Sequence, residues 1–194
     1  MMRLFAALVP PVEAVEHLDD FLEVRRASAP FRWASSEQFH VTLAFLADVE
    51  ERRLDDLTER LARAAAKRTA FETAIAGGGA FPNAARARVL WAGLDLEAAD
   101  RTELDRLATG CRAAASRAGI AVDGQRFRPH LTVARIGHPC EVSDWVKLLD
   151  GYAGPRWPAG RVELIASHLG EGPRGRPRYV NVGHFTLAGG PEVA

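Results

Sequence analysis

The sequence contains two strand-like segments that match each other around a His-x-Thr triplet. The first reads HVTLAFL and begins at His40, and the second reads HLTVARI and begins at His130. Both are rich in β-branched and aliphatic residues, which favour strands. Because side chains two apart on a strand point to the same face, Thr42 is expected beside His40 and Thr132 beside His130. The pair predicts two imidazoles and two hydroxyls that face one shared cleft.

The elements around these segments repeat in a similar order. The pattern indicates strand, helix, His-Thr strand, helix and paired strands, then helix, His-Thr strand, helix and paired strands, with 130 − 40 = 90 residues between the two histidines. Such a duplication predicts two similar lobes related by a pseudo-two-fold axis. The mixture of helices and short hairpins favours an α+β fold over a doubly wound sheet, with antiparallel sheets lining a central cleft and helices outside. No linker interrupts the chain, so we expect a single bilobal domain over residues 1–194.

Periodicity and breaker residues place the individual elements. Strands are expected over 3–9, 71–75, 88–94, 161–169 and 179–182, and helices over 11–22, 49–67, 104–118 and 141–149. Asp48 with Glu51 three residues on predicts a helix cap. The glycines 77–79 interrupt the strand pattern without the motif of a phosphate loop, and they predict a bulge or a close backbone approach.

The composition excludes a strong global attraction to nucleic acid or membrane. Lys and Arg together number 25, as do Asp and Glu, so the formal net charge is zero and any basic character must be local. Cys111 and Cys140 form no CxxC pattern, which fits a reducing cytoplasm. The sequence indicates no signal peptide and no membrane span, so we expect a cytoplasmic protein with no membrane partner. We also expect a monomer.

Two imidazoles in one cleft suit acid–base catalysis. Imidazole titrates near neutral pH, so one histidine can donate a proton while the other accepts one. Threonine hydroxyls can hold phosphate oxygens without adding charge. Together these groups suit the in-line attack of water on a phosphodiester. The sequence has no HExxH, Cys/His cluster or EF-hand pattern, so we expect no metal and no cofactor.

Two further residues need interpretation. Arg135 lies five residues after His130, an odd offset, so on a regular strand it would face away from the imidazole, and a phosphate contact would require a twist or bulge. A third triplet occurs at His184-Phe185-Thr186. It lies near the C-terminus with no following helix, and we interpret His184 as a terminal strand residue rather than a catalytic one.

At these residues the sequence resembles the two-histidine (2H) phosphoesterase superfamily, whose signature is a pair of H-x-[ST]-x motifs. It is most similar to the bacterial and archaeal RNA 2′,3′-cyclic phosphodiesterases, also called 2′-5′ RNA ligases. The resemblance extends over nearly the whole chain. It is carried, besides the two motifs, by the blocks Met2–Ala7, Arg32-Trp33, Gly79–Pro82, Arg88–Trp91 and Phe127–Arg135.

The resemblance implies a role for each site residue. His40 would be the general acid and His130 the general base, while Thr42 and Thr132 would hold the phosphate and Arg135 would contact it. The implied reaction is hydrolysis of an RNA 2′,3′-cyclic phosphate to a 2′-phosphate. The family's 2′-5′ RNA ligation is the same chemistry run backwards, with an RNA hydroxyl in place of water.

The expected partners are RNA 3′ ends, or short oligonucleotides and nucleotides, that carry a cyclic phosphate. A neutral chain argues against a long RNA footprint. Trp33, Phe45 and Trp91 are possible stacking platforms for a base, or core residues. Two alternatives stay open. One is a nucleotide- or RNA-end-binding module with weak catalysis. The other is a phosphodiesterase that acts on ADP-ribose 1″,2″-cyclic phosphate or on 2′-5′ linked oligonucleotides.

Overall fold

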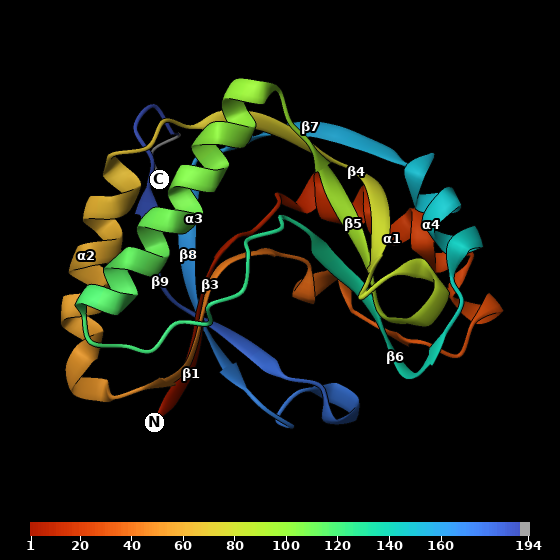
Figure 1. Cartoon of the computed structure of the whole chain (residues 1–194), viewed down its shortest axis with the longest axis horizontal. Helices are drawn as coiled ribbons and strands as arrows, with labels where there is room; N and C mark the ends of the chain where they lie inside the picture. Colours follow the sequence, from red (N-terminus) through yellow and green to blue (C-terminus); the bar gives the residue numbers. More distant parts are fainter. Residues whose placement is uncertain (191–194) are drawn as a thin grey trace.

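One antiparallel sheet runs through the molecule. The computed structural model describes residues 1–190, and these form a nine-stranded sheet in the order β7-β4-β5-β6-β3-β1-β8-β9, with β2 paired to β6 (Figure 1). The strands are β1 (Met2–Leu8), β2 (Arg32–Trp33), β3 (Val41–Val49), β4 (Phe71–Phe81), β5 (Ala87–Asp95), β6 (Leu131–Cys140), β7 (Ala153–Ala159), β8 (Arg161–His168) and β9 (Arg178–Thr186).

The sheet is nearly divided at its centre, where the two His-Thr strands meet. β3 and β6 are joined by one residue pair, Val41 with Leu131. His40 and His130 each precede a member of that pair, so the junction brings the two histidines to the same place. On one side lie β1, β8 and β9, and on the other lie β5, β4 and β7. The predicted bilobal arrangement follows from this division.

The two lobes do not coincide with the two halves of the sequence. The helices are α1 (Val12–Glu23), α2 (Leu54–Ala66), α3 (Ala98–Arg117) and α4 (Ser143–Asp150). Helices α2 and α3 pack on each other and cover the lobe of β3, whereas α1 and α4 pack on β7 and β4 in the lobe of β6 (Figure 1). The chain therefore crosses between lobes, and each lobe contains strands from both halves of the sequence.

Helices α1, α2 and α3 each carry a stripe of buried apolar side chains, whereas α4 has one buried residue, Leu149. On α2 the stripe is Leu57, Leu61 and Ala65, which are at most 1% exposed. Burying a leucine side chain contributes about 1.5–3 kcal/mol, so packing rather than helix propensity fixes this helix. Helix α3 ends before Gly119, whose φ of 75° lies in the left-handed region that favours glycine. Among residues 1–190, no helix has the length and apolar character needed to cross a bilayer.

The glycine segment 77–79 is a bulge inside a strand that is longer than the sequence pattern indicated. β4 continues through it to Phe81, and its pairing with β5 shifts register between Ile75 and Gly78. Gly79 also makes the predicted close approach, because a Cβ atom there would lie 2.2 Å from the ring of Trp91.

Two local expectations were wrong. Asp48 does not cap a helix, because β3 extends to Val49 and α2 begins only at Leu54, after a single 3-10 turn. Strand β7 was not expected, because its sequence AGPRWPA contains two prolines, which cannot donate to a β-ladder. It lies at the edge of the sheet, where one side of the strand needs no such donor.

Candidate active site

All five side chains singled out from the sequence line one cavity at the junction of the lobes. The cavity has a volume of about 430 Å³ and is lined by His40, Thr42, His130, Thr132 and Arg135. Its wall contains no Asp or Glu, and four arginines contribute to it: Arg3, Arg32, Arg135 and Arg176. A chain of zero net charge thus holds a strongly basic cleft, which attracts anions.

The two histidines are held in the same way. Nδ1–H of His40 donates to the carbonyl of Gln38 at 2.7 Å, and Nδ1–H of His130 donates to the carbonyl of Arg128 at 2.6 Å. A carbonyl oxygen can only accept, so the proton lies on Nδ1 in both neutral rings. This leaves each Nε2 as the nitrogen that can accept or deliver a proton. The matching bonds, each to the carbonyl two residues earlier, reflect the pseudo-two-fold relation.

A β-bulge turns Arg135 toward the cleft. Thr132 pairs with Trp91 and Ala134 with Leu90, so two steps on β6 oppose one step on β5 and Val133 is the extra residue. Val133 and Ala134 are both buried, which breaks the regular alternation. Beyond the bulge, the odd-numbered Arg135 therefore lies on the same face as Thr132. The bulge that a phosphate contact would require is present.

Strand β3 carries the matching bulge at Leu43. Thr42 pairs with Ala7 and Ala44 with Ala6, so again two steps oppose one, and Leu43 and Ala44 are both buried. Phe45 consequently lines the cleft at the position that Arg135 occupies on β6. The two lobes thus share their backbone irregularity and differ in the side chain that it presents.

Aromatic rings enclose both imidazoles and lower their pKa values. His40 stacks on Phe5 with ring centroids 4.5 Å apart and meets the edge of Tyr179 at 5.6 Å. Burial lowers the pKa of His40 to about 4; the Gln38 carbonyl opposes this, and the charges of His130 and Arg135 add to it.

His130 has a similar environment. It meets Phe81 edge-on at 4.9 Å, and its ring lies 6.1 Å from that of Trp91. Burial lowers its pKa, the Arg128 carbonyl raises it, and the charge of Arg135 lowers it further. Before an anion binds, both imidazoles are therefore mainly neutral at pH 7.

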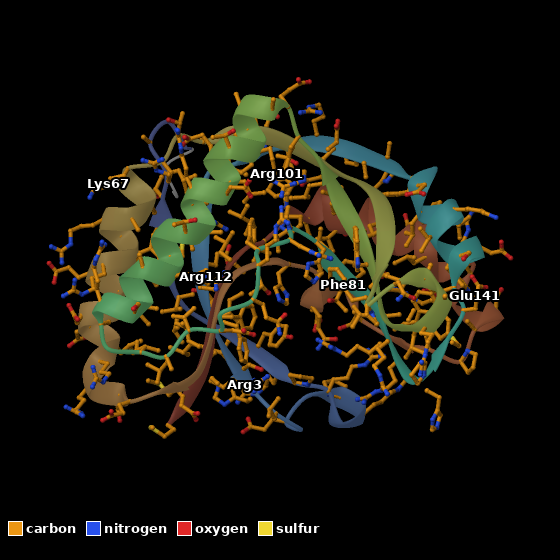
Figure 2. All side chains as sticks on the ribbon, in the orientation of Figure 1. Arg3, Lys67, Phe81, Arg101, Arg112 and Glu141 are labelled. Atoms are coloured by element: carbon orange, nitrogen blue, oxygen red, sulfur yellow. The ribbon has the colours of Figure 1, made fainter. Side chains whose placement is uncertain are left out.

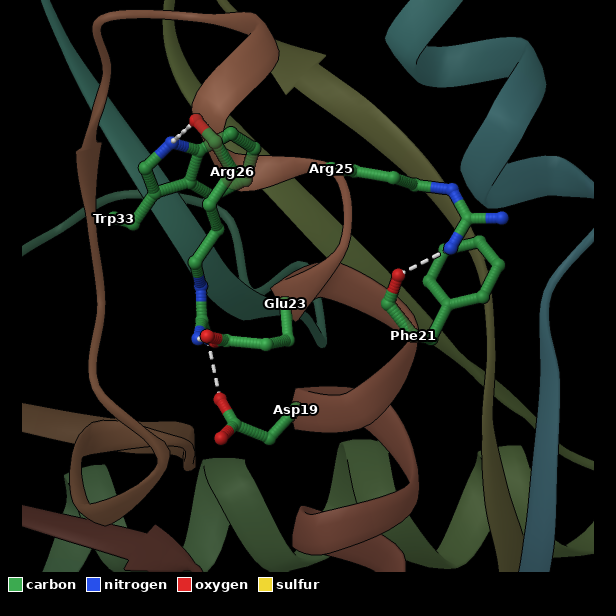
Figure 3. Close-up of polar contacts among 6 residues, drawn as sticks. All are labelled: Asp19, Phe21, Glu23, Arg25, Arg26 and Trp33. Atoms are coloured by element: carbon green, nitrogen blue, oxygen red, sulfur yellow. Dashed lines mark hydrogen bonds and ion pairs between the residues drawn. The ribbon is translucent and has the colours of Figure 1, made fainter.

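Trp33 forms a wall of the cleft and is mostly buried, with 8% of its surface exposed. Its indole N–H donates to the carbonyls of Arg26 at 3.2 Å and Ala29 at 3.3 Å. The Arg26 side chain in turn binds Asp19 and Glu23 on α1 (Figure 3). These hydrogen bonds hold the Trp33 ring in place, and Trp33 is part of the core. Phe45 and Trp91, by contrast, are half-buried.

Several other residues of the cleft carry little signal in the sequence. Arg3 and Phe5 lie two residues apart on β1, so their side chains share a face. Phe5 pairs with Phe45, and the Arg3 guanidinium lies 4.4 Å from the centre of the Phe45 ring. This spacing, on a strand beside a His-Thr strand, could have indicated that both residues line the cleft. Tyr179 reaches the cleft only because β9 pairs with β8, and no local pattern indicates that.

His184 lies on β9 opposite Glu163, is exposed, and does not line the cleft. Its placement agrees with its interpretation as a terminal strand residue. Among residues 1–190, no group of three or more His, Cys, Asp or Glu side chains is arranged to hold a metal ion.

One protein-family model matches two consecutive segments of this chain, each of which contains one His-Thr motif. The family described as LigT like Phosphoesterase matches residues 9–91 and again residues 94–175, so each match contains one His-Thr motif and together they cover most of the chain. The chain belongs to the LigT-like phosphoesterase family. The two consecutive matches also agree with the duplication inferred from the sequence.

Relatives and solved structures agree with this assignment. A Thermus thermophilus protein named RNA 2′,3′-cyclic phosphodiesterase is 32% identical over 200 residues, which cover 97% of this chain and 91% of that protein. A Geobacillus stearothermophilus protein of the same name is 36% identical over 132 residues, but the match spans only 41% of its length and 68% of this chain. Crystal structures of Escherichia coli LigT, 24% identical, share the fold with TM-scores of 0.76 in the apo form and 0.73 in complex with 3′-AMP, each covering 96% of this chain and 97% or 98% of that one. The predicted α+β bilobal fold is thereby confirmed.

Proposed function

We propose that this LigT-like phosphoesterase hydrolyses RNA 2′,3′-cyclic phosphate ends to 2′-phosphomonoesters, as a single bilobal domain. The observation that carries the proposal is the mirrored pair of histidines in one basic cleft, each oriented through Nδ1 and each followed by a threonine hydroxyl. This arrangement offers one proton donor and one proton acceptor around an anion site. The names of the relatives support a cyclic phosphate as the substrate.

In the proposed mechanism the two histidines act on opposite oxygens of the phosphorus. His130 accepts a proton from water through Nε2, and the water oxygen forms a bond to phosphorus. The bond from phosphorus to O3′ breaks in line with this attack, and protonated His40 delivers its proton to O3′. The product is a 2′-phosphate with a free 3′ hydroxyl, and the proton lost by water balances the proton gained by O3′.

Substrate binding allows His40 to take up from solvent the proton that it must deliver. The pKa of about 4 means that His40 is neutral at pH 7 before the substrate binds. A cyclic phosphate carries one negative charge, which raises the pKa of a nearby imidazole and offsets the charge of Arg135. Thr42 and Thr132 form no side-chain hydrogen bond within the described part of the chain, so their hydroxyls are available to phosphate oxygens. The cleft therefore becomes a competent acid–base pair when the anion enters.

The cleft fits one terminal nucleotide rather than a long RNA. Its volume of about 430 Å³ is in the range of small-molecule sites, which is roughly 300–1,000 Å³. Phe5, Phe45 and Tyr179 provide aromatic surface beside His40 on which a base can stack. We therefore propose the terminal nucleotide of an RNA 3′ end as the recognised group.

The test is hydrolysis of an oligonucleotide that ends in a 2′,3′-cyclic phosphate, measured in the presence of EDTA. Removing a general acid or base costs about 10²–10⁴-fold in rate, so H40A and H130A should each lose at least 100-fold. His184→Ala is the matched control, because this histidine also precedes an x-Thr pair but lies outside the cleft, and it should retain full activity. Full hydrolysis by H40A and H130A would refute the proposal. Tight nucleotide binding without turnover by the unchanged protein would favour a binding module instead.

A further inference from the structure

The two lobes present different side chains to the cleft at matching positions. After its bulge, β6 presents Arg135, whereas β3 presents Phe45 after the equivalent bulge. The residue paired with Arg135 is Val89 on β5, and the residue paired with Phe45 is Phe5 on β1. The lobe of β6 therefore offers a charge for a phosphate, and the lobe of β3 offers aromatic rings for a base.

The rings in the lobe of β3 form a surface that is separate from the main core. Phe5 is buried in a small cluster with Ala7 and Ile165. Phe45 and Tyr179 are half-buried and pack against that cluster. All three rings, Phe5, Phe45 and Tyr179, line the cleft, and we call them the aromatic floor. The floor is held from below and open to the cleft, as a stacking surface for a base must be.

Arg3 lies beside the aromatic floor with its donors free. Its guanidinium lies 4.4 Å from the centre of the Phe45 ring, and it lines the cleft. Within residues 1–190, the Arg3 side chain forms no ion pair and no hydrogen bond. Burial raises the pKa of Tyr179, and the charges of Arg135 and Arg3 oppose this, so Arg3 is within electrostatic range of that hydroxyl. Figure 2 labels Arg3 in the lobe of β3, whereas Phe81 lies in the lobe of β6.

A guanidinium recognises a particular arrangement of acceptors on a base. It is a rigid planar fork of N–H donors, which matches two adjacent acceptor atoms. Guanine presents such a pair at O6 and N7, and cytosine, whose edges are all accessible at a single-stranded end, presents one at N3 and O2. Adenine instead places an amino donor beside N7 and N1, and uracil places N3–H between its two carbonyl oxygens. An arginine beside a stacked base therefore favours guanine and cytosine.

We infer that Arg3 is a specificity-determining residue, which reads the edge of a base stacked on the aromatic floor and favours guanine or cytosine at the terminal position. The inference rests on the proposed function, in which O3′ leaves toward His40. The ribose that carries O3′ then lies on the His40 side of the phosphate, and Phe5 of the aromatic floor stacks on the His40 ring with centroids 4.5 Å apart. The base of the same nucleotide is thereby brought to the lobe of β3, where Arg3 lies.

The test compares the four nucleoside 2′,3′-cyclic phosphates as substrates of the unchanged protein and of two variants. R3K keeps the positive charge but removes the planar fork, so it separates the reading of a base from general attraction of the phosphate. R25K is the matched control. The Arg25 guanidinium lies 4.2 Å from the centre of the Phe21 ring, which is the same kind of contact outside the cleft (Figure 3). Thermal unfolding checks that each variant is folded.

In the unchanged protein, kcat/KM should be at least 5-fold higher for the guanosine and cytidine substrates than for the adenosine and uridine substrates, because a good bidentate contact discriminates by roughly 5–150-fold. In R3K this ratio should fall to within twofold. The change should lie in KM, because the base is bound equally in the ground state and the transition state. R25K should keep the ratio of the unchanged protein. Titration calorimetry with the four nucleoside 2′-phosphates, which are the products, should show the same order of affinities without turnover.

The absence of a base preference in the unchanged protein would overturn the inference, as would a full preference in R3K or an equal loss of preference in R25K. A uniform loss on all four substrates in R3K, with the ratio kept, would also overturn it, because Arg3 would then contact the phosphate rather than the base. Failure of the proposed function is a different result. In that case none of the four cyclic phosphates would be hydrolysed, while calorimetry with the 2′-phosphates would still report whether Arg3 selects a base.

Discussion

The stability of the protein should depend on pH through His40. The pKa of this imidazole is about 4 in the folded chain, against an ordinary value of 6.5. Between these two values the unfolded chain binds a proton that the folded chain does not, so acidification favours unfolding. The full contribution of neutral His40 is present above pH 6.5 and is lost as the pH falls toward 4.

The size of the effect follows from the two pKa values. At pH 5 the linkage relation gives a destabilisation of at most about 2 kcal/mol, and at pH 7.5 it gives about 0.1 kcal/mol. The variant H40Q has no group that titrates at this position. The difference in unfolding free energy between the unchanged protein and H40Q should therefore shift by about 2 kcal/mol, to the disadvantage of the unchanged protein, when the pH is lowered from 7.5 to 5.

The assay is urea denaturation followed by tryptophan fluorescence, in buffers without phosphate because a bound anion would raise the pKa of His40. His184→Gln serves as the control for the His→Gln change itself, because that side chain is exposed and lies outside the cleft. Parallel pH dependences of the unchanged protein and H40Q, within about 0.5 kcal/mol, would refute the burial argument. They would mean that water reaches His40 freely and that its pKa is close to the ordinary value.

Three further outcomes are expected. R135Q should raise the pKa of both cleft histidines, because the charge of Arg135 lowers each, and NMR titration measures this effect. The same variant should bind inorganic phosphate about 10–150-fold more weakly, because it removes a charged hydrogen bond, and calorimetry measures the loss. Unchanged histidine titration in R135Q would contradict the argument. Gly79→Ala should destabilise the fold by about 1–3 kcal/mol, because its Cβ would lie 2.2 Å from the ring of Trp91. The control Gly137→Ala should not destabilise it, because a Cβ there would have no atom within 4 Å. Equal melting temperatures for the two variants would count against the clash. Thr132→Val should lower kcat/KM at least 10-fold on a cyclic phosphate with little change in unfolding free energy, and unaltered kinetics would exclude the hydroxyl from phosphate binding.

The His-Thr strands could be predicted because their information is local. β-branched and aliphatic residues fix the strand, and alternation fixes which side chains share a face, so Thr42 follows His40 into the cleft. The duplication could be predicted for the same reason, since each copy carries its own signal. The fold class followed from the order of such elements.

From the sequence, Arg135 could be expected to reach the phosphate only if its strand contained a twist or a bulge. The bulge at Val133 arises from the register of β6 against β5, and nothing in the residues around Val133 distinguishes a bulged valine from a regular one. Tyr179 and the strand β7 were missed for related reasons. The first is brought in by pairing between distant strands, and the second has prolines that an edge position alone permits. What the local sequence cannot state is which segments become neighbours.

The crossing of the chain between lobes has a consequence for synthesis on the ribosome. β1 is flanked by β3 on one side and by β8 on the other, with Leu4 paired to Ala166. A nascent chain that stops before residue 161 therefore carries both His-Thr motifs but leaves one edge of β1 without its partner. Contacts between such distant segments form late and slowly, because the closure of a long loop must come first. The cleft thus becomes complete only when almost the whole chain has been made, so a product truncated there should be inactive although both motifs are present.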